Sequence, residues 1–198
     1  MKLKNRYFLV RHGESLKNVK NIVACWPEKI YSPLTKKGIT EAKKAAKLLK
    51  NKKISIIFAS DLLRTRQTAG IIAKTIKLKI NLDKRLREIN LGILNGKLVD
   101  EAGKFWAIPG KKLSPIQYYK RRYKIAPKNG ETYEDLEERL KSFVKDCEEK
   151  YSDKNILIVS HERPLTLLEK VIKGNSFKEL VNILQNKKQI KTGEVREI

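Results

Sequence analysis

The stretch RYFLVRHGESLKN, residues 6–18, decides the fold of this chain of 198 residues. Its apolar residues 7–10 form a run of strand length that leads directly into Arg11 and His12, and Gly13 then allows a turn. The chain has two histidines, and the second, His161, also directly follows a short apolar run, residues 156–159. Because the carboxyl ends of parallel strands line the crevice in which ligands bind, the sequence predicts that both imidazole rings lie at a functional site.

Strand-like and helix-like segments alternate along the rest of the chain. Further apolar runs of strand length lie at residues 54–59 and, more weakly, at 78–82. Apolar residues recur every three or four positions at 35–49, 62–76, 133–151 and 164–172, which is typical of amphipathic helices. This alternation predicts an α/β fold, a three-layer sandwich whose mainly parallel central sheet is covered by helices on both faces.

The length and the even pattern favour a single domain over residues 1–198. Residues 92–130 break the rhythm, because Gly, Pro, Trp and Tyr are mixed there with cations. We expect them to form an irregular, partly helical cap over the sheet. No apolar stretch is long enough to span a bilayer, and none resembles a secretory signal, so we expect a soluble, cytoplasmic protein without membrane contact. The two cysteines are expected to be free thiols.

The chain is strongly basic, with 45 Lys and Arg against 22 Asp and Glu and a net charge of +23. Lysines make up 34 of these cations and occur almost everywhere in the sequence. This spread favours a solvated lysine surface over a nucleic-acid footprint, although QYYKRRYK, residues 117–124, has the local appearance of one. We therefore expect at most weak, non-specific binding of nucleic acid, and a small anionic partner fits the charge equally well.

A third strand end adds matching chemistry. The sequence IIFASDLLRTRQT ends its strand at Ser60 and begins a helix at Asp61, so Arg64 lies about one turn into that helix. Arg64 can then converge with Arg11 and the two histidines. Guanidinium groups bind phosphate through paired, charge-assisted hydrogen bonds, and an unprotonated histidine can attack phosphorus. The sequence therefore predicts a phosphate-binding site with a nucleophilic histidine.

Six motifs in the expected order cover most of the chain, and with them the sequence resembles the histidine phosphatase superfamily, in its phosphoglycerate-mutase-like branch. The motifs are RHGESLKN at 11–18, SPLTKKGITEA at 32–42, ASDLLRTRQTA at 59–69, LREINLGILNGK at 86–97, NGETYEDLEERL at 129–140 and ILIVSH at 156–161.

The resemblance implies a role for each matching residue. His12 would be the phosphorylated nucleophile, His161 would stabilise the transferring group, and Glu88 would protonate the leaving oxygen. The residues implied to bind the phosphoryl group are Arg11, Arg64 and Asn18. The family chemistry uses no metal ion. Cations around one phosphoryl group also stabilise the charge of the transition state and keep a histidine unprotonated.

The sequence departs from the family at two places. Glu162 and Arg163 follow the second histidine, where the family usually has glycine. We expect Glu162 to turn outward or to pair with a cation, and Arg163 to contact the substrate or to remain a surface residue. The second departure lies near the cap. Arg121 and Arg122 resemble the paired arginines that mutases place near the substrate carboxylate, but Leu91 and Val99 stand where mutases carry a tyrosine and a lysine.

Three functions follow from these observations. The first is a phosphohistidine-dependent phosphomonoesterase that acts on a small phosphorylated metabolite without a cofactor. The alternative is a 2,3-bisphosphoglycerate-dependent phosphoglycerate mutase, which would use bisphosphoglycerate as a primer. The third is a basic nucleic-acid-binding protein on an inactive version of the fold, and the presence of every expected catalytic residue type argues against it. The sequence leaves a homodimer open.

Overall fold

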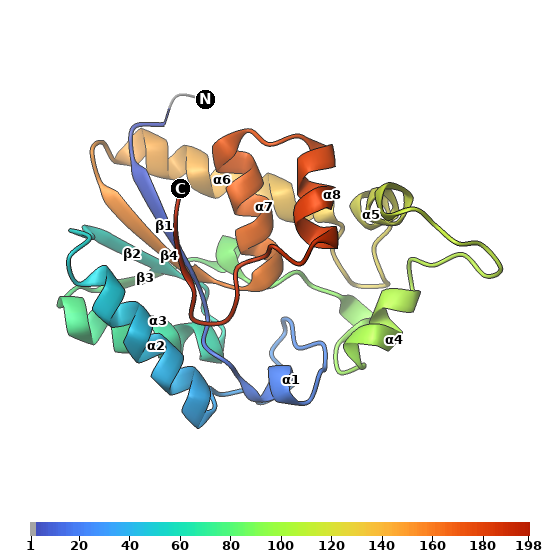
Figure 1. The fold of residues 1–198 in the computed structure, drawn as a ribbon, viewed down its shortest axis with the longest axis horizontal. Coiled ribbons are helices and arrows are strands. Elements are labelled where there is room, and N and C mark those ends of the chain that lie inside the picture. Colours follow the sequence, from blue (N-terminus) through green and yellow to red (C-terminus); the bar gives the residue numbers. More distant parts are fainter. Residues whose placement is uncertain (1–2) are drawn as a thin grey trace.

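A five-stranded sheet forms the centre of the structure, a computed structural model that describes residues 3–198 (Figure 1). The strands are β1 (Arg6–Arg11), β2 (Ile56–Ala59), β3 (Ile80–Leu82), β4 (Asn155–Ser160) and β5 (Val195–Glu197). They lie in the order β3-β2-β4-β1-β5, and all neighbouring pairs are parallel except β5 on β1. Arg11 and Ser160 are register partners, so the chain leaves β1 and β4 at adjacent points of one sheet edge.

Helices cover both faces of this sheet, as the sequence predicts. On one face, α2 (Lys36–Leu49) and α3 (Leu63–Ile76) pack against Phe8 and Val10 of β1. On the other face, α6 (Tyr133–Lys150), α7 (Glu162–Lys173) and α8 (Phe177–Gln185) pack against Tyr7 and Leu9 (Figure 1). Successive residues of a strand point to opposite faces, so one apolar run supplies two cores. The three-layer α/β fold is therefore confirmed.

The cap region is partly helical and lies beside the carboxyl end of the sheet (Figure 1). It contains a short 3₁₀ turn η2 (Gly92–Leu94), α4 (Val99–Lys104) and α5 (Pro115–Lys124). The indole of Trp106 is 2% exposed, and its Nε1 donates to the Ile125 carbonyl at 2.8 Å. This buried anchor ties α4 to the end of α5. Two other short elements, α1 (Leu16–Val19) and η1 (Lys84–Leu86), follow strand ends.

Some local details differ from the sequence prediction. The sequence analysis predicted neither α8 nor β5. Strand β5 has only three residues and no apolar run, and its pairing with β1 stabilises it. Asp61 does not begin α3. The helix N-cap is Leu62, and the Asp61 carboxylate instead accepts from Nε of Arg87 at 2.7 Å.

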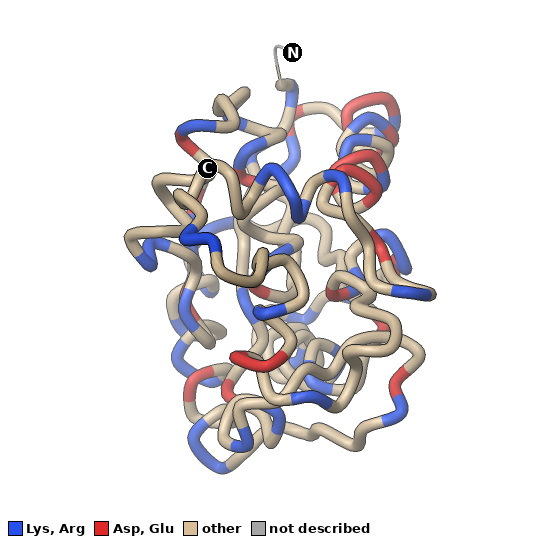
Figure 2. The backbone as a smooth tube through the Cα atoms, turned by 90° about the vertical axis from the view of Figure 1, so that its right-hand side faces the viewer, with Lys and Arg blue, Asp and Glu red and all other residues tan. Residues whose placement is uncertain are grey.

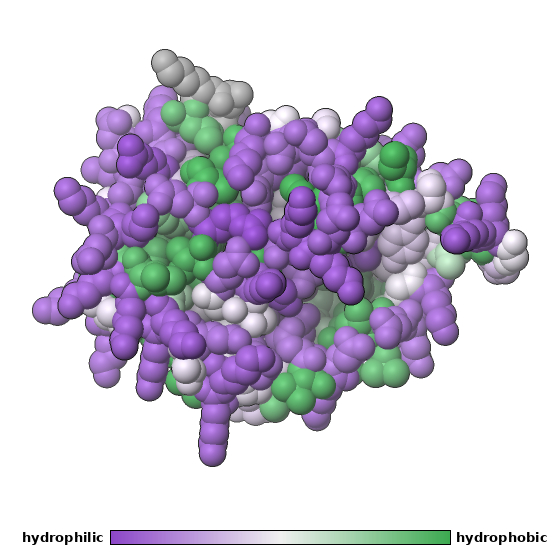
Figure 3. Space-filling view, in the orientation of Figure 1, coloured by the Kyte–Doolittle hydropathy of each residue, from purple (hydrophilic) through white to green (hydrophobic). Residues whose placement is uncertain are grey.

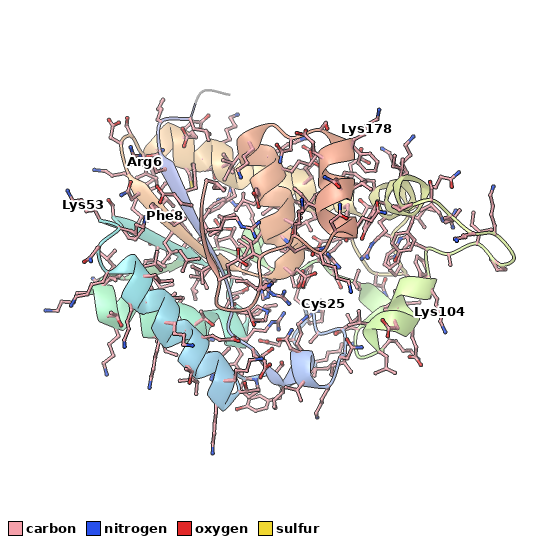
Figure 4. All side chains as sticks on the ribbon, in the orientation of Figure 1. Arg6, Phe8, Cys25, Lys53, Lys104 and Lys178 are labelled. Atoms are coloured by element: carbon pink, nitrogen blue, oxygen red, sulfur yellow. The ribbon has the colours of Figure 1, made fainter. Side chains whose placement is uncertain are left out.

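Charged residues are distributed along the whole described chain. Figure 2 shows Lys and Arg along all parts of the backbone, and hydrophilic residues dominate the face in Figure 3. The exposed side chains of Lys53, Lys104 and Lys178 extend away from the ribbon (Figure 4). No helix within residues 3–198 is both long enough and apolar enough to cross a membrane.

Candidate active site

The two histidines meet at the edge of the sheet where β1 and β4 end. The backbone N–H of His12 donates to the carbonyl of Ser160 at 3.0 Å, which continues the pairing of the two strands by one residue. Both rings are fully buried, their centroids lie 5.2 Å apart, and their planes meet at 63°. The predicted convergence of His12 and His161 is present in the structure.

Two glycines allow the loop after β1 to approach the start of α2. A Cβ atom on Gly13 would lie 2.3 Å from the carbonyl oxygen of Gly38, and one on Gly38 would lie 2.0 Å from that of Glu14. Only glycine fits such a close backbone contact. Thr68 accepts from the Gly13 N–H at 3.1 Å and holds the loop from α3. The glycines of the RHG and SPLTKKG motifs thus act as a pair that positions His12.

The hydrogen bonds of His12 define which ring nitrogen can react. Its Nδ1 lies 2.8 Å from the carbonyl oxygen of Gly13 and therefore carries the proton. Nε of Arg64 donates to the other nitrogen, Nε2, at 3.2 Å. Burial lowers the pKa of His12 well below its usual value, and the charges of Arg64 and Arg11 lower it further. His12 is therefore neutral, and Nε2, whose lone pair accepts from Arg64 in this structure, is the nitrogen that can attack phosphorus.

His161 contacts a neighbouring side chain through Nε2. Its Nε2 lies 2.9 Å from the hydroxyl of Ser60, and that hydroxyl also accepts a long hydrogen bond from the Leu62 N–H at 3.4 Å. A serine hydroxyl can donate or accept, and when it donates to Nε2 the ring proton lies on Nδ1. Nδ1 is buried and has no hydrogen-bond partner among residues 3–198, and burial, Arg64 and His12 lower the pKa of the ring. A neutral His161 can therefore donate one hydrogen bond to a phosphoryl oxygen.

Ser60 was not identified as a functional residue by sequence reasoning. It lies just after β2, and the only signal in the sequence is its position at a third strand end. A contact between a serine hydroxyl and a histidine ring 101 residues away can be recognised only after the fold brings residues 60 and 161 together.

The arginines and Asn18 present unused donors near His12. Arg64 is fully buried, its Nη2 donates to the carbonyl of Ala24 at 3.0 Å, and its Nη1 lies 3.7 Å from a carboxylate oxygen of Glu28. Nε of Arg11 is buried and lacks a hydrogen-bond partner in the described part of the chain. The amide oxygen of Asn18 accepts from the backbone N–H of Ser15 at 3.0 Å, which leaves its NH₂ group for a ligand.

A cavity of about 230 Å³ opens next to these groups, between α1, α4 and α7. Figure 4 labels Cys25, whose neighbour Ala24 lines this cavity. The polar lining residues are Arg11, Lys17, Asn18, Asn21, Glu88, Arg122, Glu162 and Arg163. Apolar residues from the cap and nearby loops, among them Leu91, Val99 and Trp106, form the opposite part of the wall. Leu91 and Val99 therefore face the cavity with no hydrogen-bonding side chain.

Lys17 is a cavity residue that sequence reasoning missed. Burial, assisted by the charges of Arg64 and Arg11, lowers its pKa from 10.5 to about 8, while Glu88 and Glu162 oppose the shift. The ammonium group can contact a bound phosphoryl or leaving group. One lysine among 34 carries no sequence signal that separates it from the surface lysines.

Two carboxylates line the cavity, and their surroundings differ. Glu88 is 8% exposed, and its Oε1 accepts from the backbone N–H of Ile89 at 3.1 Å. Glu162 lies 2.5 Å from Nη1 of Arg11 and 3.0 Å from Nη1 of Arg163. Burial raises the pKa of Glu162, but Arg163 and Arg11 outweigh it and hold that pKa below its usual value. Glu162 therefore stays ionised through its two arginine contacts.

The structure separates the two adjacent arginines of α5. Arg122 lines the cavity, is 8% exposed, and its guanidinium lies 4.2 Å from the ring centre of Trp106 and 4.7 Å from that of Tyr133. Arg121 does not line the cavity, because its Nε donates to the carbonyl of Trp106 at 2.8 Å. Only Arg122 of the predicted pair, together with Arg163, is placed to meet a substrate.

Residues 7–193 match the family described as Histidine phosphatase superfamily (branch 1), and the chain belongs to this superfamily. A protein of Yersinia pestis (strain Pestoides F), named Probable phosphoglycerate mutase GpmB, is 32% identical over 173 residues, which cover 84% of this chain and 74% of that relative. The sequence motifs therefore identified the family correctly.

Two solved structures illustrate the shared fold. Bacillus stearothermophilus YhfR is 30% identical with a TM-score of 0.73, covering 89% of this chain and 83% of its own. A mycobacterial glucosyl-3-phosphoglycerate phosphatase in complex with VO3 is 22% identical with a TM-score of 0.79, covering 97% and 91%. At that lower identity the likeness concerns the fold alone. Within residues 3–198 no group of three or more His, Cys, Asp or Glu side chains is arranged to hold a metal ion.

Proposed function

We propose that this protein is a phosphohistidine-dependent phosphomonoesterase that acts on a small phosphorylated metabolite. The observation that carries the proposal is the state of His12, a buried neutral ring whose Nε2 lone pair meets a guanidinium beside a cavity of about 230 Å³. A nucleophilic nitrogen surrounded by donors fits phosphoryl transfer, in which catalysis consists mainly of positioning and charge stabilisation.

In the first step the phosphoryl group of the substrate binds to Arg11, Arg64 and Asn18, and Nδ1 of His161 donates to one of its oxygens. Nε2 of His12 attacks phosphorus in line with the leaving oxygen. The N–P bond forms as the bond from phosphorus to the alcohol oxygen breaks. Glu88 gives its proton to that oxygen, because an alkoxide is a poor leaving group at neutral pH.

In the second step water attacks the phosphohistidine. Glu88, now ionised, takes a proton from the water, the N–P bond breaks, and inorganic phosphate leaves. His12 returns to its neutral form. The cations around the site have two effects on this cycle. They keep His12 unprotonated, and they stabilise the negative charge that the phosphoryl oxygens carry in each transition state.

Labelling tests the covalent step. Incubation with a ³²P-labelled monoester, followed by an alkaline quench, should give a label on the protein that acid removes, and His12→Ala should give none. Equal labelling of His12→Ala, or a label that is stable to acid, would contradict the proposed nucleophile.

The mutase is the second candidate, because the 32% identical relative bears a mutase name and because Arg122 lies in the cavity. We favour hydrolysis because Leu91 and Val99 present apolar surface where a mutase needs polar groups to hold its substrate and exclude water. Each missing hydrogen bond to a charged carboxylate weakens binding by about 1.5–3 kcal/mol. With 3-phosphoglycerate and catalytic bisphosphoglycerate, release of phosphate without isomerisation supports the hydrolase. Fast interconversion with little phosphate would establish the mutase.

A further inference from the structure

Glu162 occupies a position inside the cavity that the family usually fills with glycine. It is the first residue of α7 and directly follows His161, which is the N-cap of that helix. Its two carboxylate oxygens contact different arginines: Oε2 lies 2.5 Å from Nη1 of Arg11, and Oε1 lies 3.0 Å from Nη1 of Arg163. A negative charge next to a phosphate-binding guanidinium requires an explanation, because it repels the anion that the guanidinium binds.

The contacts of Arg11 show which edge of its guanidinium Glu162 uses. Nη1 also donates to the carbonyl of Ile190 at 3.2 Å, so this nitrogen already contacts two groups of the protein itself. The backbone of Arg11 is held as well, since the N–H of Gly193 donates to its carbonyl at 3.0 Å. Nε is buried and has no hydrogen-bond partner in the described chain. A guanidinium has five N–H donors, so the edge with Nε and Nη2 stays available.

We propose that Glu162 is a positioning residue that holds the guanidinium of Arg11 by Nη1 so that its Nε edge meets the transferring phosphoryl group. This proposal rests on the proposed function of the site. Glu162 does not compete with the substrate in this arrangement, because it occupies Nη1 and leaves the Nε edge free. The ion pair with Arg11 links α7 to β1, and Nη1 of Arg163 lies 3.0 Å from the other carboxylate oxygen.

A fixed arginine fork matters most when the phosphoryl group becomes trigonal bipyramidal, because its three equatorial oxygens then spread into one plane. Vanadate adopts that geometry when a nucleophile such as Nε2 of His12 coordinates the vanadium, whereas inorganic phosphate stays tetrahedral. Loss of Glu162 should therefore weaken vanadate binding more than phosphate binding. If Glu162 instead competed for Arg11, its removal would strengthen the binding of both anions.

The experiment measures the dissociation constants of vanadate and phosphate by calorimetry for the wild type, Glu162→Gln and Glu162→Gly. For Glu162→Gly we expect vanadate binding to weaken about tenfold or more and phosphate binding by less than about threefold. Glu162→Gln should lie between the wild type and Glu162→Gly, because its amide oxygen still accepts from Arg11. Asp146→Asn is the matched control, since Asp146 pairs with Arg85 at 2.6 Å and neither residue lines the cavity.

The proposal is overturned if both anions weaken by the same factor, or if both bind more tightly in the variants. Far-UV circular dichroism of each variant checks that the fold is kept, and Glu162→Gln provides the measurement if Glu162→Gly does not fold. Failure of the proposed function has a different signature, because the wild type would then bind neither anion and release no phosphate from monoesters.

Discussion

We expect the activity of the wild type to fall above about pH 8 as Lys17 loses its proton. The variant Lys17→Met should not show this decline. Lys17 lines the cavity with Arg11 and Glu88, and burial lowers the pKa of its ammonium group to about 8, with Arg64 as the next contributor. The charged form is the one that can contact a phosphoryl oxygen. The free enzyme should therefore lose kcat/KM about tenfold per pH unit above about 8.

The size of the effect follows from the same contact. A hydrogen bond from a charged donor contributes about 1.5–3 kcal/mol, so Lys17→Met should lower kcat/KM at pH 7 by about 10 to 100-fold. The variant should also be more stable. The folded pKa of Lys17 lies below its ordinary value of 10.5, so the folded state disfavours the ammonium form by at most about 3 kcal/mol. This penalty is fully present below pH 8 and disappears as the pH rises from about 8 towards 10.5.

The assay is the pH dependence of kcat/KM between pH 5.5 and 9.5 at constant ionic strength, with urea unfolding at pH 7 beside it. Lys20→Met is the control, because Lys20 is the exposed C-cap of the same short helix. A Lys17→Met enzyme that keeps the decline near pH 8, or that matches the wild type in kcat/KM at pH 7, would refute the assignment. If Lys17→Met is less stable than the wild type at pH 7, the expected free-energy cost of holding the Lys17 ammonium group in the folded state is refuted.

Three further substitutions test other parts of the site. Glu88→Gln should lower the hydrolysis rate of an alkyl phosphate at least about tenfold more than that of an aryl phosphate, because an aryl oxide needs little protonation; equal losses would make Glu88 a binding residue. Ser60→Ala removes the hydroxyl 2.9 Å from Nε2 of His161 and should lower kcat by about tenfold, and it should reduce the free energy of unfolding by about 1–3 kcal/mol because a buried ring nitrogen loses its partner; an unchanged kcat would show that the reaction does not depend on this contact. Gly38→Ala places a Cβ atom 2.0 Å from the carbonyl oxygen of Glu14 and should reduce the free energy of unfolding by more than about 2 kcal/mol in urea titrations, and a stability equal to that of the wild type would contradict the close packing.

The α/β class and the position of both histidines could be derived from the sequence because each depends on a local pattern. An apolar run of strand length, such as residues 7–10 or 156–159, indicates a buried strand wherever it occurs, and the rule for parallel sheets then brings the residues after both strands to one edge. The motifs identified the superfamily for a similar reason. Gly13 and Gly38 make a backbone contact that no other residue fits, and both glycines lie within the motifs that carry the resemblance.

The identity of the remaining cavity residues depends on contacts between distant segments. Arg121 and Arg122 are neighbours in the sequence, yet consecutive residues of a helix point about 100° apart, so the packing of α5 against Trp106 turns one away from the cavity and the other towards it.

Lys17 and Ser60 illustrate the same limit. Nothing in the local sequence distinguishes Lys17 from a surface lysine, and Ser60 gains its role only when β2 and β4 become neighbours in the sheet. By itself, therefore, the sequence determined which residues end the strands and which motifs define the superfamily. Only the tertiary structure decided that Lys17 and Arg122 line the cavity, that Ser60 contacts His161, and that Glu162 pairs with Arg11. Local periodicity specifies the face of an element, whereas burial, charge and hydrogen bonding at a site depend on the elements that pack around it.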